Sequence, residues 1–129
     1  MNALSSALVC IARHPDQWRV LRDNTALARS AFEESIRFES PVQTFFRTTS
    51  EETSAEGVRI GAGEKVLTFL GAANRDPRRW PDAIQFNIRR NAVGHVGFGA
   101  GIHACIGQMF ARLEGEIVLA QLARKVESL

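Results

Sequence analysis

The sequence predicts a mainly α fold with a minor antiparallel β-sheet. Helical periodicity fills the N-terminal third and the C-terminal end, and β-branched and aromatic runs occur only between them. A long stretch rich in glycine and proline separates these runs from the final helix. The 129 residues, 45% hydrophobic and 23% charged, amount to about one domain of ordinary globular composition.

Three helices are expected in the N-terminal third. The first covers residues 3–12, and Pro15 breaks the pattern because a proline disfavours helix at the residue before it. The second covers residues 16–22, with an acid in its first turn and arginines late, as the helix dipole favours. The third covers residues 27–38 and ends at Ser40-Pro41. One face of it carries Leu27, Ala31, Phe32, Ser35 and Ile36.

The central region predicts a small sheet and a long irregular segment. Residues 42–49 are expected to form a strand and residues 50–57 an exposed connection. Residues 58–60 and 65–69 are expected to pair as a hairpin around the glycine turn at 61–63. Residues 71–107 lack periodicity. The final helix, 108–126, is expected to be amphipathic, with an apolar stripe of Ile106, Phe110, Leu113, Ile117 and Ala120.

Charge and cysteine content exclude several classes of function. A net charge of +2 is too small for a field that draws the whole chain to nucleic acid or to an anionic membrane. The longest apolar run, residues 7–12, is too short to span a bilayer. Cys10 and Cys105 are far apart and form no Cys-x-x-Cys pair, so neither a zinc site nor a disulfide framework is indicated. We expect a cytoplasmic protein with no nucleic-acid or membrane partner.

The most informative segment is the cysteine loop, residues 98–107, with the sequence Phe-Gly-Ala-Gly-Ile-His-Ala-Cys-Ile-Gly. Cys105 stands just before a helix N-terminus, where free amides and the helix dipole favour a thiolate. Such a thiolate can be a redox nucleophile, a metal ligand or the axial ligand of a haem iron. A lone cysteine can equally be a small buried hydrophobe.

The whole loop resembles the haem-binding signature of the cytochrome P450 superfamily, Phe-Gly-x-Gly-x-His/Arg-x-Cys-x-Gly, at every fixed position. The resemblance implies haem b as cofactor, with the Cys105 thiolate as the iron ligand and the one indispensable residue. It also implies that Phe98, Gly99, His103 and Gly107 bind the cofactor, with His103 contacting a propionate. The expected fold is then the C-terminal, proximal-haem part of the P450 fold.

A second motif of the same family is Glu34-x-x-Arg37. Residues three apart on a helix share a face, so the carboxylate can hold the guanidinium; alone, such a pair is usually an ordinary surface salt bridge. In the family a third polar residue locks the pair. Arg89 or Arg90 is the candidate here, and we assign Arg90, although Gln85 replaces the arginine common in relatives. Loss of Glu34 or Arg37 is expected to reduce stability and haem retention.

The segment 39–47 resembles the corresponding strand of soluble bacterial members that oxidise para-substituted benzoates. By this resemblance Val42 and Phe45 face the substrate. Separately, Phe46-Arg47-Thr48 resembles the family's strand whose arginine contacts a haem propionate, which implies that role for Arg47. Apolar strand residues are as often plain core, so packing is an equal alternative for Val42 and Phe45.

The resemblance implies a monooxygenase that uses dioxygen, a small aromatic substrate and a ferredoxin-like electron donor. Family members are several times longer, and residues 3–12 resemble only the end of their long distal helix, without its acid-alcohol pair. We therefore expect residues 1–129 to be a partial domain that supplies the proximal half of the site. The alternative is a haem-binding fragment or remnant that is incompetent in catalysis.

Overall fold

The computed structural model describes residues 2–129, so Met1 of the expected partial domain lies outside the described residues. The element order is α1 (Asn2–Ala12), α2 (Pro15–Asp23), η1 (Thr25–Leu27), α3 (Ala28–Glu39), β1 (Thr44–Thr48), β2 (Thr53–Ala55), β3 (Val58–Ile60), β4 (Lys65–Phe69), α4 (Leu70–Ala73), η2 (Gly101–His103) and α5 (Gln108–Lys125). The expected mainly α fold with a minor antiparallel sheet is confirmed.

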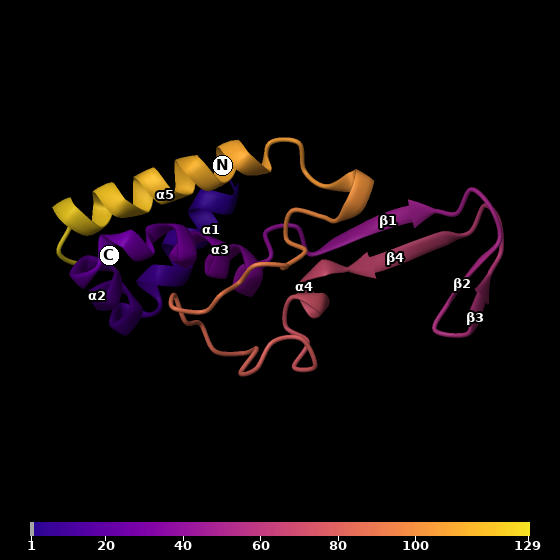
Figure 1. Ribbon diagram of the computed structural model, residues 1–129, viewed down its shortest axis with the longest axis horizontal. Coiled ribbons are helices and arrows are strands. Elements are labelled where there is room, and N and C mark those ends of the chain that lie inside the picture. Colours follow the sequence, from indigo (N-terminus) through magenta and orange to yellow (C-terminus); the bar gives the residue numbers. More distant parts are fainter. Residues whose placement is uncertain (1) are drawn as a thin grey trace.

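The helices gather at one end of an elongated molecule, and the strands extend from the other end (Figure 1). Helix α3 packs against both α1 and α5 and so occupies the centre of the helical layer. The core contains the face predicted for α3, with Ala31, Phe32 and Ile36 at most 1% exposed. Trp18 of α2 joins this core and donates from Nε1 to the carbonyl of Glu127, which holds the C-terminus against α2.

The predicted pairing of the strands was wrong. Strand β4 pairs with β1 instead of β3. Strand β3 pairs with β2, which lies within residues 50–57, the segment expected to be an exposed connection. Glu56 and Gly57 both have positive φ, as a two-residue hairpin turn requires, so the chain reverses there. The turn at Glu56 and Gly57 therefore sets the pairing of β2 with β3. This hairpin lies beyond the β1–β4 ladder (Figure 1).

Most of the apolar stripe predicted for α5 lies outside the core of the described residues. The expected apolar stripe is exposed, from 52% at Ile117 to 103% at Ile106, although Ala120 does pack against the core. The buried positions are instead Gly115, Leu119 and Ala123. A Cβ at Gly115 would overlap the ring of Phe32, so the glycine permits the close crossing of α3 and α5.

Candidate functional site

The polar centre of the molecule is an ion pair on α3. Arg37 donates from Nε to Glu34 Oε2 at 2.7 Å and from Nη2 to Glu34 Oε1 at 2.9 Å, and both side chains are fully buried. The Nη1 group donates to the carbonyls of Asn74, at 2.7 Å, and Ala83, at 3.0 Å. Arg37 therefore ties α3 to two points of the long irregular stretch, and every buried side-chain polar atom of the described residues has a partner.

Arg90 completes this cluster from the irregular stretch. Its Nε donates to Glu34 Oε1 at 3.1 Å, and its other N–H groups bind the carbonyls of Pro81 and Asp82. The alternative candidate, Arg89, is exposed. The structure thus brings Glu34, Arg37 and Arg90 together, and the backbone carbonyl of Gln85 lies within 3.5 Å of both arginines.

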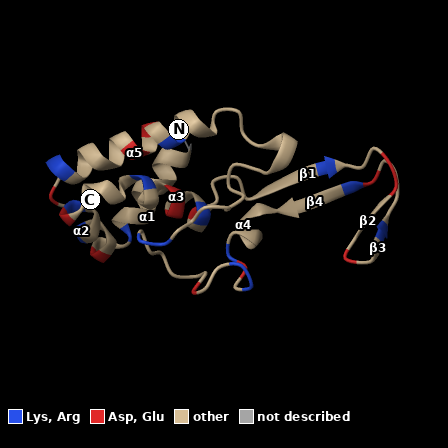
Figure 2. Cartoon of the chain, in the orientation of Figure 1, with Lys and Arg blue, Asp and Glu red and all other residues tan. Residues whose placement is uncertain are grey.

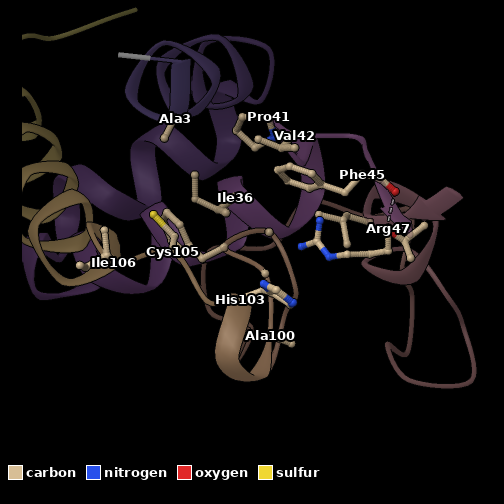
Figure 3. Close-up of a pocket in the computed structure, with 15 residues that line it drawn as sticks. Ala3, Ile36, Pro41, Val42, Phe45, Arg47, Ala100, His103, Cys105 and Ile106 are labelled. Atoms are coloured by element: carbon tan, nitrogen blue, oxygen red, sulfur yellow. Dashed lines mark hydrogen bonds between the residues drawn. The ribbon is translucent and has the colours of Figure 1, made fainter. Parts of the chain in front are cut away.

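A cavity of about 910 Å³ lies between the cysteine loop and β1. Its lining includes Val42, Phe45 and Arg47 on one side and Phe98, Gly99, His103 and Cys105 on the other, with Ile36 of α3 in the wall. Phe45 and Arg47 reach into the cavity from β1, opposite His103 and Cys105 of the loop (Figure 3). Of the predicted site residues in this region, only Gly107 falls outside the lining.

The cysteine loop is shaped by backbone contacts. The N–H of Cys105 donates to the carbonyl of Phe98 at 2.8 Å, which closes the loop. Gly99 has φ +76°, and a Cβ there would lie 2.9 Å from the carbonyl oxygen of His103. A Cβ at Gly107 would lie 3.9 Å from the sulfur of Cys105, an ordinary van der Waals distance. The loop presents Cys105 as an exposed free thiol.

The second cysteine has the opposite environment. Cys10 belongs to α1 and is fully buried in the core, and burial raises the pKa of its thiol to about 12. This cysteine therefore stays protonated and inert near neutral pH, as a structural cysteine does. Only Cys105 of the two is placed to act as a ligand or nucleophile.

The residues of the cavity fit a haem group. The walls are mainly apolar, the exposed thiol is the soft ligand that suits iron, and Arg47 and His103 supply N–H donors for carboxylates. The guanidinium of Arg47 stacks 5.1 Å from the ring of Phe45 and donates to the carbonyl of Phe46, so it is held at the cavity. The segment 91–111, which contains the cysteine loop, carries no Asp, Glu, Lys or Arg and is tan in Figure 2.

Val42 and Phe45, the predicted substrate residues, are 40% and 45% exposed at the cavity. They are not among the buried core residues of the described chain. Their contact with a substrate stays a prediction.

Sequence reasoning missed a second polar cluster and one bridging amide. Glu33 binds His95 and Arg112 beneath Phe98, and Asn74 connects Ser40 to the amide of Val96. A histidine three residues before Phe98 and an arginine seven residues after Cys105 were visible in the sequence. Their common partner on α3 was not, because only the packing of three distant segments brings them together.

Fold and site together define a protein class in which haem is held by a cysteine thiolate. A model of the family described as cytochrome P450 matches residues 2–127, and the chain belongs to this family. It is 59% identical over 129 residues to cytochrome p450 CYP199A2 of Rhodopseudomonas palustris and 41% identical to the biotin biosynthesis cytochrome P450 of Bacillus subtilis. The chain covers 31% and 33% of these two proteins, about a third of their length.

Solved structures give the same result. The chain superimposes with a TM-score of 0.93 on P450BioI, solved with an acyl carrier protein bearing hexadec-9Z-enoic acid, at 41% identity over 98% of this chain and 33% of that one. It superimposes with a TM-score of 0.90 on the cytochrome P450 CREJ, solved with (4-ethylphenyl) dihydrogen phosphate, at 35% identity over 95% of this chain and 31% of that one. The expected P450 fold and haem cofactor are therefore confirmed. None of the helices within residues 2–129 is both long and apolar enough to cross a membrane.

Proposed function

We propose that this chain is the proximal, haem-binding part of a monooxygenase that inserts one oxygen atom of dioxygen into a small aromatic substrate. The observation that carries the proposal is the exposed thiol of Cys105 in the wall of the apolar cavity, opposite Arg47. Residues 1–129 would then form part of a longer domain, in keeping with the third of its relatives' length that the chain covers.

Each residue of the cavity has a defined task in this proposal. Cys105 would bind the iron, while Arg47 and His103 would hold the two propionates by charge-assisted hydrogen bonds. Phe98, Gly99 and Gly107 would hold the loop close to the face of the macrocycle. Glu34, Arg37 and Arg90 would keep the irregular stretch in place beneath the site. Val42 and Phe45 would contact the substrate and exclude water from it.

The bound haem would supply the oxygen chemistry, because a thiolate ligand directs electron density to iron and favours cleavage of the O–O bond. The second oxygen atom leaves as water, which requires two electrons and two protons for each turnover. A ferredoxin-like donor that delivers single electrons would meet this requirement, and we propose such a protein as the partner.

Haem ligation is tested by the absorption spectrum of the protein loaded with haem, reduced and exposed to carbon monoxide. We expect the red-shifted Soret band of thiolate ligation in the wild type and in Cys10→Ala, and its loss in Cys105→Ala. The Cys10 variant is the matched control because it removes the other, buried thiol. A wild type that takes up no haem, or a band unchanged in Cys105→Ala, would refute the proposal. Haem uptake with thiolate ligation but no oxidation would favour the incompetent fragment.

The aromatic substrate is supported by the resemblance of residues 39–47 to the benzoate-oxidising members and by the aromatic ester bound in CREJ. We expect 4-substituted benzoates to perturb the Soret band of the loaded protein. Phe45→Ala is expected to weaken this binding by about tenfold, the effect of losing about 1.4 kcal/mol of apolar contact. Phe46→Ala, the neighbouring and more exposed phenylalanine outside the lining, is the control. Equal effects of the two variants would exclude the substrate role of Phe45.

A further inference from the structure

A second carboxylate of α3, Glu33, binds two groups from distant segments. Its Oε2 accepts from His95 Nε2 at 2.8 Å, and its Oε1 accepts from Arg112 Nε at 2.5 Å. The side chains are 13%, 1% and 18% exposed for Glu33, His95 and Arg112. One carboxylate therefore joins α3, the irregular stretch and α5 through charge-assisted hydrogen bonds that are largely removed from solvent.

Both partners of Glu33 contact the first residue of the cysteine loop. The guanidinium of Arg112 lies 4.7 Å from the ring centroid of Phe98, within the range of a cation–π contact. The ring of His95 lies 5.8 Å from the same centroid, tilted by 40°. The position of the Phe98 ring thus depends on two groups whose orientation the Glu33 carboxylate holds.

The backbone of this segment is fixed from the same cluster. The N–H of Gly97 donates to His95 Nδ1 at 3.1 Å, so Nδ1 is the acceptor and Nε2 carries the hydrogen that is donated to Glu33. A Cβ at Gly97 would lie 2.6 Å from Ile36 Cγ2, which leaves this backbone no room to shift toward α3. The next carbonyl, that of Phe98, accepts the N–H of Cys105 at 2.8 Å. An unbroken path of contacts therefore leads from Glu33 to Cys105.

The charge of the cluster is balanced. Burial alone raises the pKa of Glu33, but the hydrogen bonds from His95 and Arg112 outweigh it and hold the pKa below its usual value. Glu33 is therefore ionised and compensates the positive charge of Arg112, the first charged side chain after the uncharged segment 91–111. Removing the carboxylate would leave this guanidinium partly buried beside Phe98 with Gln108 as its remaining side-chain partner in the described contacts.

We propose that Glu33 is a positioning residue for Cys105, acting through His95, Arg112 and Phe98. The inference rests on the proposed function, because it assigns to this cluster the orientation of the thiolate that would bind the iron. A residue with only a structural role would change the stability of the fold but not the chemistry of the thiol.

The test compares Glu33→Gln with Glu116→Gln. Glu116 also bridges α3 and α5, by an exposed ion pair to Arg29 at 3.5 Å, but has no contact with Phe98 among the described interactions. In the haem-free protein, the rate of Cys105 alkylation by iodoacetamide reports the loop, because Cys10 is buried and protonated. We expect this rate to change by at least about threefold in Glu33→Gln and by less than about twofold in Glu116→Gln, since the position of the exposed thiol at the start of α5 sets its reactivity.

In the haem-loaded protein the readout is the Soret band of the reduced carbon monoxide complex. We expect Glu33→Gln to convert part of the haem to the band of Cys105→Ala, whereas Glu116→Gln keeps the wild-type band. Arg112→Lys, which keeps the charge but loses the planar fork over Phe98, is expected to act in the same direction. This variant decides the question if Glu33→Gln fails to fold.

Wild-type alkylation rates and wild-type bands in both Glu33→Gln and Arg112→Lys would overturn the inference. Failure of the proposed function would give a different result, namely a wild type that takes up no haem. The alkylation rates of Glu33→Gln and Glu116→Gln can still be compared in that case, because they are measured without haem. The haem-free measurement then still decides whether Glu33 positions the cysteine loop.

Discussion

Two neighbouring glutamates of α3 serve different regions of the molecule. Glu34 is fully buried and binds two arginines and the amide of Asn87, so it holds the irregular stretch to the helical core. Glu33 is 13% exposed and binds His95 and Arg112 beneath the cysteine loop. Consecutive residues on a helix point about 100° apart, so one short helix can anchor two separate networks.

The Glu34 network is the more deeply buried of the two, whereas the Glu33 network contacts the cysteine loop. Glu34 and Arg37 are fully buried, so loss of the Glu34 carboxylate leaves a buried charge without a partner and destabilises the whole fold. The Glu33 cluster contacts Phe98, which lines the cavity, so its loss is expected to alter the loop more than the global stability. Four predictions test this division, in order of decreasing effect on the free energy of unfolding.

The largest loss is expected for Glu34→Gln. The substitution keeps the shape of the side chain but leaves the buried guanidinium of Arg37 without its counter-charge, a change that costs about 3–5 kcal/mol. Urea unfolding followed by circular dichroism measures it. The double variant Glu34→Gln with Arg37→Met should lose less than the sum of the two single variants, because the fully buried charge of Arg37 is removed together with its partner. A single-variant loss below about 1 kcal/mol would contradict the prediction.

A smaller loss is expected for Gly115→Ala at the crossing of α3 and α5. Alanine normally stabilises a helix, but its Cβ here would overlap the ring of Phe32, and overpacking costs about 1–3 kcal/mol. Both networks depend on this crossing, so the change should also loosen the contact between Glu33 and Arg112. Phe32→Leu in the same chain should restore part of the stability. If Gly115→Ala proves more stable than the wild type, the proposed close crossing is wrong.

A pH-dependent effect is expected for Glu33→Gln. Because the pKa of Glu33 is lowered in the folded state, its stabilising contribution is present above the ordinary carboxyl pKa and is lost as the pH falls through the lowered value. The free energy of unfolding of the wild type should exceed that of the variant by about 1 kcal/mol at neutral pH, and this difference should become smaller below about pH 4. Urea unfolding at both pH values measures it. A gap that is constant or widens in acid would contradict the sign.

The smallest effect is expected for Glu116→Gln. Its ion pair with Arg29 spans 3.5 Å between side chains that are 40% and 53% exposed, so solvent screens most of the attraction. The change should be within about 0.5 kcal/mol and should shrink further in high salt. A loss of unfolding free energy as large as that of Glu33→Gln at neutral pH would show that the stabilisation comes from bridging α3 and α5 and not from contact with the loop.

Motifs could be read directly where chemistry depends on residues close together in the sequence. The cysteine loop and the i, i+3 pair of Glu34 and Arg37 are of this kind, and so are the helices 3–12, 16–22 and 27–38, which match α1, α2 and α3 within a few residues. Strand pairing was not readable in this way, because β1 and β4 are separated by an inserted hairpin and meet only in the folded chain.

The sequence by itself determined the family and the cofactor, because these depend on residue types at fixed short spacings. Tertiary structure alone decided which face of α5 packs against α3, since Gly115 meets the ring of Phe32 at their crossing. It also decided that Arg90 rather than Arg89 reaches Glu34, and that Glu33 meets His95 and Arg112. Such contacts join residues more than fifty positions apart, and no local pattern encodes the distance between them.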